Sequence, residues 1–288
     1  MDLKQSFVEL LRRAATDLSP DVENALKQAH DREEDGSPAK AVFRTILENV
    51  RLAREQSTPM CQDTGSLIFY IDLPVGEKEE YYINIIKEAA EEATKKQYLR
   101  PNAVNPITGK NSGNNVGINA PYFHFHQWDK GEVRVRLMLK GGGSENVGTQ
   151  YKLPYGPVHA GRDLAGVRKV IIDAVYKAQG LGCAPGTLGI GIGGDRVTSY
   201  ALSKEQFFRK LGDRNPDKEI AEFELSLKDD LNKLNIGPMG FGGKTTVLDV
   251  FVGYQHRHPA TFYVAISYMC WAFRRKTMTI KNGEVYYD

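Results

Sequence analysis

Two spacings of apolar residues follow one another along this sequence, and they limit the fold more than any other feature. Near the N-terminus, apolar residues recur three and four positions apart among charged residues, which predicts amphipathic helices. From Leu67 onward, short apolar or alternating segments typical of strands are interleaved with further helical segments. With no repeat and no low-complexity linker, we expect one α+β domain over residues 1–288, mainly helical in 1–56.

The individual elements follow from these spacings and from Gly, Pro and Asn signals between them. Helices are expected at residues 2–15, 20–30, 38–55, 77–96, 162–179, 203–211 and 217–235. Strands are expected at residues 67–73, 132–139, 187–192, 247–253 and 261–268, followed by a hairpin turning at Asn282-Gly283. Residues 100–120 are rich in Asn, Gly and Pro and predict a long loop, and long ordered loops in compact domains usually have a function.

The charge balance excludes some classes of function. Lys and Arg number 38 against 36 Asp and Glu, and the two signs are mixed along the chain, so nucleic-acid binding has no support. The first residues have helical spacing rather than the continuous apolar segment of a signal peptide, and no apolar run approaches membrane-spanning length. We therefore expect a cytoplasmic protein with no membrane association.

Three cysteines, Cys61, Cys183 and Cys270, are the most informative residues. An odd number of widely separated cysteines is a poor disulfide framework, and an isolated cysteine is ordinarily a small buried hydrophobe. Here, however, each lies where a loop or the end of an element is expected, and Cys61 and Cys183 have Gly or Pro within two residues. Three thiolates would leave one iron of a four-iron cluster open, as a Lewis-acid catalyst requires. Zinc is the weaker alternative, because structural zinc ligands are usually paired within a few residues.

Several motifs carry a family resemblance. Cys61-Gln-Asp-Thr-Gly65, Lys140-Gly-Gly-Gly-Ser-Glu-Asn146, Cys183-Ala-Pro185 leading to Gly189-Ile-Gly-Ile-Gly-Gly194, and His258-Pro259 twelve residues before Cys270-Trp271 occur in that order. Together they resemble the N-terminal domain of class I fumarases, or the separate α subunit of the two-subunit forms. The resemblance extends from about Arg51 to Arg275. One departure is Ala184, where the family usually has proline, which concerns the stiffness of the loop rather than its ligand.

The resemblance implies a 4Fe-4S cluster held by Cys61, Cys183 and Cys270, with the open iron binding a substrate carboxylate and the hydroxyl that is eliminated. Asp63 resembles the catalytic aspartate, which works with a threonine of the family's other domain. An alternative is that Asp63 only caps the turn before Gly65. Elimination of water from malate supports the catalytic role, because a weakly acidic C3 proton needs a base.

Four further residues match family positions that contact substrate, namely Gln62, Arg100, Gly143 and His258. A dianionic C4 acid requires donor and cationic groups, and arginine offers a planar, two-pronged match to a carboxylate. The glycines at 141–143 have the backbone freedom to point N–H groups at an anion. The resemblance gives no role to the remaining histidines, which are His124, His126, His159 and His256.

Two nucleotide-binding strings are present but weak. Gly189-x-Gly191-x-x-Gly194 matches the dinucleotide fingerprint, yet a Cys-Ala-Pro-Gly turn precedes it and a convincing βαβ unit is missing. Gly242-Gly-Lys-Thr245 looks like the end of a phosphate loop, but the earlier glycine that such a loop needs falls on Pro238. No nucleotide is predicted.

The resemblance also implies a partner. The family's other domain contributes the threonine, further arginines and a lysine, so we expect a separate β subunit to complete the site, in an α2β2 assembly. The expected reaction is reversible hydration of fumarate to (S)-malate, with L(+)-tartrate dehydratase as the alternative within the family. A non-catalytic scaffold that binds metal through the same thiolates is the alternative from a different class.

Overall fold

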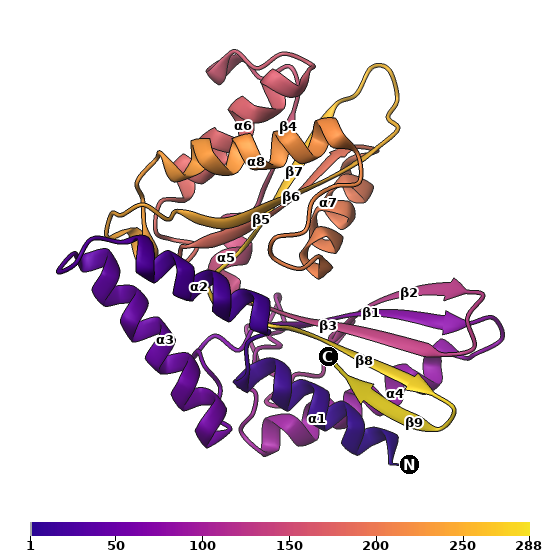
Figure 1. Ribbon diagram of the computed structural model, residues 1–288. Helices are drawn as coiled ribbons and strands as arrows, with labels where there is room; N and C mark the ends of the chain where they lie inside the picture. The colour runs from indigo at the N-terminus through magenta and orange to yellow at the C-terminus, as the bar shows by residue number, and fades with distance from the viewer. Residues whose placement is uncertain (1) are drawn as a thin grey trace. The chain divides into compact units, whose positions relative to one another are not determined.

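A computed structural model describes residues 2–288, and their contacts divide the chain into two compact units. Unit 1 contains the chain up to Ser19, Glu48–Gly142 and Arg274–Asp288. Unit 2 contains Pro20–Leu47 and Gly143–Phe273. Helices and mixed sheets occur in both units, which confirms the α+β class (Figure 1).

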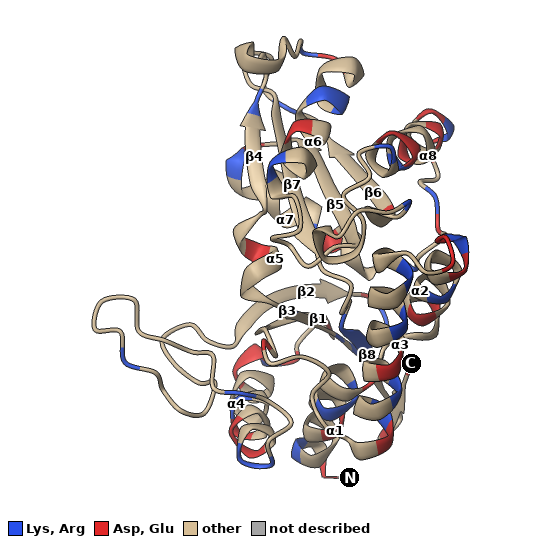
Figure 2. Cartoon of the chain, turned by 90° about the vertical axis from the view of Figure 1, so that its left-hand side faces the viewer, with Lys and Arg blue, Asp and Glu red and all other residues tan. Residues whose placement is uncertain are grey.

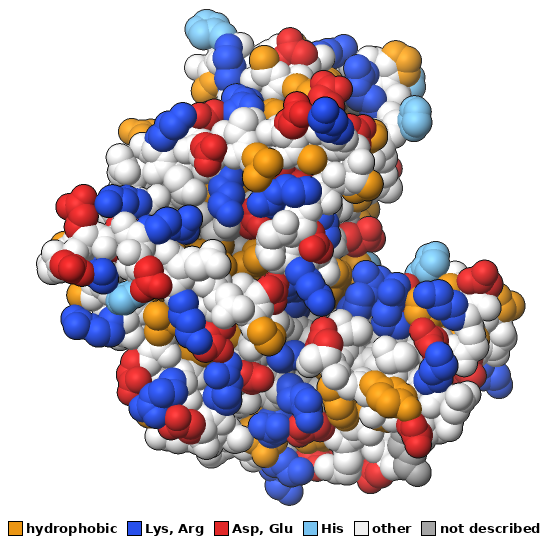
Figure 3. Space-filling view, in the orientation of Figure 1, with side chains coloured by type: hydrophobic (Ala, Val, Ile, Leu, Met, Phe, Trp, Pro, Cys, Tyr) orange, Lys and Arg blue, Asp and Glu red, His pale blue; other side chains and the backbone are white. Residues whose placement is uncertain are grey.

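Unit 1 is a five-stranded sheet with two helices on one face (Figure 1). Its strands in spatial order are β2 (Tyr122–Trp128), β1 (Ser66–Pro74), β3 (Val133–Lys140), β8 (Arg275–Lys281) and β9 (Glu284–Tyr287). Among these five described strands, only β1 and β2 form a parallel pair. Apolar residues of α1 (Leu3–Thr16) and α4 (Glu79–Lys95) form one core with the inward side chains of β1 and β3. On the face that carries α1, acidic and basic side chains are interspersed (Figure 3), and Glu9 pairs with Arg12 and Arg13.

Unit 2 is a four-stranded sheet with helices on both faces (Figure 1). The strand order is β4 (Thr149–Lys152), β7 (Tyr263–Met269), β5 (Gly186–Gly193) and β6 (Val247–Gln255). The helices α6 (Leu164–Ala178) and α8 (Lys218–Asn232) bury their apolar residues with Leu188 and Ile190 of β5. The helix α7 (Arg196–Glu205) packs against β5 and β7, and a short helix α5 (Gly142–Asn146) follows β3.

The chain passes from unit 2 to unit 1 within α3 (Pro38–Gln56), which follows α2 (Pro20–Arg32). With α1, these helices confirm the expected helical N-terminal region within the described residues 2–56. The long loop is also confirmed: between α4 and β2 only isolated bridges form, and the loop projects away from the helix and the sheet (Figure 2).

Two expectations about the elements were wrong. The helix predicted at residues 203–211 begins earlier, at Arg196, because Asp195 and Thr198 form a reciprocal N-terminal cap, and a 3-10 turn replaces its end at Gln206–Phe208. Strands β2 and β4 were not predicted, although the aromatic and polar residues of β2 alternate. Within residues 2–288, no helix combines the length and apolar character needed to cross a membrane.

Candidate functional site

The first predicted motif forms a turn in unit 1. Residues Cys61 to Gly65 lead directly into β1, whose first residue, Ser66, pairs with Lys140 at the end of antiparallel β3. The start of one strand therefore lies beside the end of the other, which brings Asp63 to the glycines that follow Lys140. Sheet register, rather than closeness in sequence, creates this contact.

Both carboxylate oxygens of Asp63 accept backbone hydrogen bonds. The N–H of Gly65 donates to Oδ1 over 3.0 Å, and the N–H of Gly142 donates to Oδ2 over 2.7 Å. Gly65 has a φ of +84°, and a Cβ there would come within 2.8 Å of the Lys140 backbone, so only glycine fits this turn. Asp63 therefore caps the turn before Gly65, and the N–H of Gly142 in the glycine run donates to the Asp63 carboxylate.

Arg274 is a buried cation near Asp63 that the sequence interpretation missed. Its side chain is 1% exposed, and its Nε and Nη1 atoms find no acceptor in the part of the chain that the structure describes. A Cβ built on Gly141 would lie 3.0 Å from Asp63 Oδ2 and 3.6 Å from Arg274 Nη2. The Asp63 carboxylate and the Arg274 guanidinium therefore both lie next to Gly141. An arginine shortly after the last cysteine was the available sequence signal.

Arg100 and Gln62 also belong to unit 1, and both are exposed. The main chain of Arg100 is nevertheless fixed, because its N–H donates to Oγ1 of Thr64 over 3.1 Å. Arg100 thus lies close to the turn that contains Asp63, with its guanidinium accessible. Thr64 is fully buried and was not singled out in the sequence.

Cys183 and Cys270, 87 positions apart in the sequence, adjoin one another in unit 2. Cys183 precedes β5 and Cys270 follows β7, and these neighbouring strands are antiparallel. The N–H of Trp271 donates to the carbonyl of Cys183 over 3.1 Å. Cys183 has a φ of 56°, and Cys270 is 9% exposed.

Tyr268 packs beneath this pair of cysteines. Its ring occupies the space that side chains at Gly182 and Gly186 would fill, since a Cβ there would lie 2.6 and 2.3 Å from ring atoms. Its hydroxyl is buried without a hydrogen-bond partner among the described residues. Burial raises the pKa of Tyr268, and the negative charge of Cys270 and Cys183 raises it further.

The donor chemistry of the pair suits an iron–sulfur cluster, whose usual ligands are cysteine thiolates. Among residues 2–288, no group of three His, Cys, Asp or Glu side chains is arranged to hold a metal ion. Cys61, the third predicted ligand, is half-buried in unit 1.

The structure does not bring His258 to the cysteine pair within unit 2. His258 precedes β7, whereas Cys270 follows it, so the seven residues of the strand separate them by about 20 Å. His258 instead lines an exposed pocket of about 600 Å³ with Arg196 and Arg257. Gly143 is exposed at the start of α5, and its predicted contact with substrate stays a prediction.

Comparison with known proteins establishes the family. A family model described as fumarate hydratase (fumerase) matches residues 4–279, which is nearly the whole chain. The chain therefore belongs to the class I fumarate hydratase family, as its motifs indicated.

Individual relatives divide between two names. A protein of Geobacillus stearothermophilus named "Putative fumarate hydratase class I" is 48% identical over 98% of this chain, which spans 56% of that relative's length. The "L(+)-tartrate dehydratase subunit alpha" of Escherichia coli K12 is 33% identical over 92% of this chain, and the match covers 86% of that relative's length. A Methanocaldococcus jannaschii protein named "Putative L(+)-tartrate dehydratase subunit alpha" is 36% identical over 98% of each chain.

Proposed function

We propose that this chain is the α component of an iron–sulfur hydro-lyase that reversibly hydrates fumarate to (S)-malate. Cys61, Cys183 and Cys270 would hold a 4Fe-4S cluster. The observation that carries this proposal is the pairing of Cys183 and Cys270 from distant parts of the sequence. When bound, such a cluster supplies a Lewis acid that polarises the departing hydroxyl.

The chain's own residues would bind the dicarboxylate and handle the proton. Asp63 would accept the C3 proton of malate and return it to fumarate in hydration. Its two backbone hydrogen bonds fix the carboxylate while leaving lone pairs for a proton. Arg100 would bind one substrate carboxylate with its exposed guanidinium, assisted by Gln62. Gly143 would approach the substrate through its backbone.

A partner would complete the site. Two relatives of which this chain spans 98% and 86% are named alpha subunits, which supports assembly with a β subunit. The complex would be α2β2. His258 would bind the second substrate carboxylate. Because it lies at the opposite end of β7 from Cys270, it would have to reach the site of a second copy of the chain. The proposed α2β2 complex would offer such a copy.

The substrate is the finer part of the proposal. The 48% identity to the relative named for fumarate, against 36% and 33% to those named for tartrate, favours fumarate. L(+)-tartrate dehydration is the second candidate because several relatives are named for it, including those of M. jannaschii and E. coli K12.

The test is anaerobic co-purification with the β chain, followed by visible absorbance and turnover of fumarate, malate and tartrate. We expect a brown complex with the highest kcat/KM for fumarate or malate, and inactivation in air. A brown complex inert toward all three acids would favour a metal-binding scaffold. Full activity of this chain alone would refute the need for a partner.

A further inference from the structure

The main chain of Arg100 is held from both sides by side chains distant in sequence. Its N–H donates to Thr64 Oγ1 over 3.1 Å, and its carbonyl accepts from Asn115 Nδ2 over 2.8 Å. Arg100 also precedes Pro101, which restricts it to extended conformations. Its backbone is thus fixed while its guanidinium stays exposed.

Thr64, Asn102 and Asn115 form one polar network around this point. Asn102 Nδ2 donates to Thr64 Oγ1 over 2.9 Å and to the carbonyl of Gly65 over 3.2 Å. The N–H of Asn102 donates to Asn115 Oδ1 over 2.8 Å. Thr64 is 0% and Asn115 5% exposed, so these bonds are shielded from water and costly to leave unmade.

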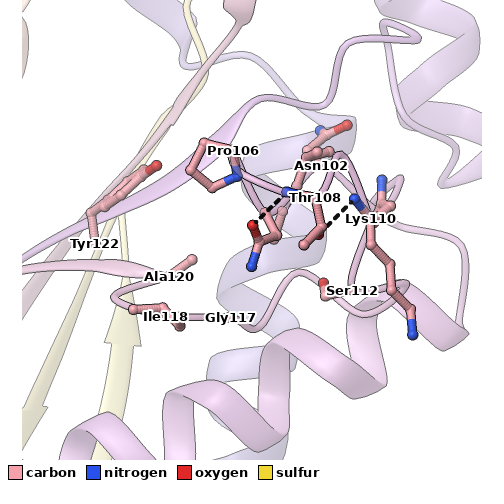
Figure 4. Close-up of a pocket in the computed structure, with 13 residues that line it drawn as sticks. Asn102, Pro106, Thr108, Lys110, Ser112, Gly117, Ile118, Ala120 and Tyr122 are labelled. Atoms are coloured by element: carbon pink, nitrogen blue, oxygen red, sulfur yellow. Dashed lines mark hydrogen bonds between the residues drawn. The ribbon is translucent and has the colours of Figure 1, made fainter.

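The network joins the turn of Asp63 to the projecting loop. Asn102 and Tyr122 lie on opposite sides of a pocket of about 700 Å³ formed by that loop (Figure 4). The loop is braced internally, for example by the N–H of Lys110, which donates to Thr108 Oγ1 (Figure 4). Asn111 Nδ2 donates to the carbonyl of Pro101 over 2.9 Å. The loop therefore presents Arg100 from a rigid support.

We infer that Thr64 and Asn115 are positioning residues, which fix Arg100 relative to Asp63 so that its guanidinium meets a carboxylate of the bound substrate in one geometry. This inference rests on the proposed function, since it assumes that Arg100 binds the dicarboxylate. Thr64 forms no bond to the Asp63 side chain, and its hydroxyl contacts Arg100 and Asn102 instead. Its effect should therefore fall on substrate binding more than on proton transfer.

The test is steady-state kinetics with fumarate and malate on the cluster-loaded complex. Thr64→Val keeps the volume but removes the acceptor, and we expect KM to rise about tenfold while kcat changes less than about threefold. Thr64→Ser should restore KM. Thr16→Val is the matched control, because Thr16 is also a buried threonine of unit 1 but its hydroxyl donates to the carbonyl of Arg12 within its own helix, outside this network. Its KM should stay near that of the wild type.

A double-mutant cycle separates positioning from a purely structural role. If Thr64 acts through Arg100, Thr64→Val should add no further increase in KM to Arg100→Ala. Should Thr64→Val fail to fold, Asn115→Gly tests the other support of Arg100, because it removes the bond from Asn115 Nδ2 to the Arg100 carbonyl. Glycine tolerates the φ of 63° at this position. Its KM should rise in the same way.

Three results would overturn the inference, and only the last would also contradict part of the proposed function. Additive effects of Thr64→Val and Arg100→Ala on KM, or a lowered melting temperature with unchanged KM, would leave Thr64 a structural residue and the proposed function intact. An unchanged KM in Arg100→Ala would remove Arg100 from substrate binding and the inference with it.

Discussion

Replacing Asp63 with asparagine distinguishes a catalytic acid from a turn cap, because the structure shows the cap directly. Asparagine keeps one carbonyl oxygen, so it can retain the bond to Gly65 N–H at 3.0 Å. Its amide nitrogen then faces the N–H of Gly142, where the carboxylate accepted a bond of 2.7 Å. Losing one charge-assisted hydrogen bond costs about 1.5–3 kcal/mol of stability.

The catalytic role predicts a second, larger effect. Removing a general base lowers kcat by about 10²- to 10⁴-fold, which corresponds to about 3–5 kcal/mol of activation free energy. Urea unfolding would measure the stability, and the disappearance of fumarate would measure turnover. Asp217→Asn is a matched control, since Asp217 Oδ1 also accepts bonds from two N–H groups. Asp63→Asn with turnover within about threefold of the wild type would leave Asp63 only its role in the turn.

Three further predictions concern the cluster, a buried cation and alkaline stability. Cys183→Ala should abolish the visible absorbance of the anaerobically reconstituted complex, and retention of the full spectrum would remove Cys183 from the ligands. Arg274→Met should keep or raise the melting temperature, because it removes a buried guanidinium whose Nε and Nη1 have no partner among residues 2–288. Turnover should fall at least about tenfold, because Arg274 and Asp63 both lie next to Gly141. A large loss of stability with normal turnover would contradict this prediction. Burial and the nearby Glu77 raise the pKa of Tyr82 to about 12. As pH rises, the Tyr82 hydroxyl therefore deprotonates in the unfolded chain before it does so in the folded chain. The free energy of unfolding should fall between about pH 10 and pH 12. In urea unfolding at pH 11, Tyr82→Phe should show a smaller alkaline loss than the wild type, and an equal loss would contradict the assignment.

Periodicity predicted most of the fold because the helices bury one side. The strands β1, β5 and β6 are instead buried on both faces, and short apolar segments identified them. The apolar spacing located α1 and α8, and the alternation located β3. Strand β2 lies at the edge of its sheet, where half of its side chains are exposed polar residues, so its hydrophobic signal is weak. The start of α7 is set by the capping pair Asp195 and Thr198, a local signal that the apolar pattern does not contain.

The site was predictable only as far as residue types identify chemistry. The cysteine motifs and Asp63 stand out because their neighbours are unusual for core residues. By contrast, the contacts of Thr64 and the position of Arg274 near Asp63 depend on which distant segments of the chain meet, which no spacing in the sequence states. The contact of Asp63 with Gly142 arises from the antiparallel register of β1 and β3, across 79 positions of the sequence.

The glycines of β5 match the dinucleotide fingerprint, but in this fold they allow α7 to pack closely on the strand. Gly189 and Gly191 lie on the same face of the strand, where α7 packs. A Cβ at these positions would come within 2.1 Å of the Ser203 carbonyl oxygen and 2.0 Å of the Ser199 carbonyl oxygen. The glycines therefore let a helix backbone approach a strand backbone, and they are required whether or not a phosphate is ever nearby. Since Cys183 immediately precedes this strand and Cys270 follows its neighbour β7, close packing of α7 on β5 and β7 also stiffens the support of the thiol pair.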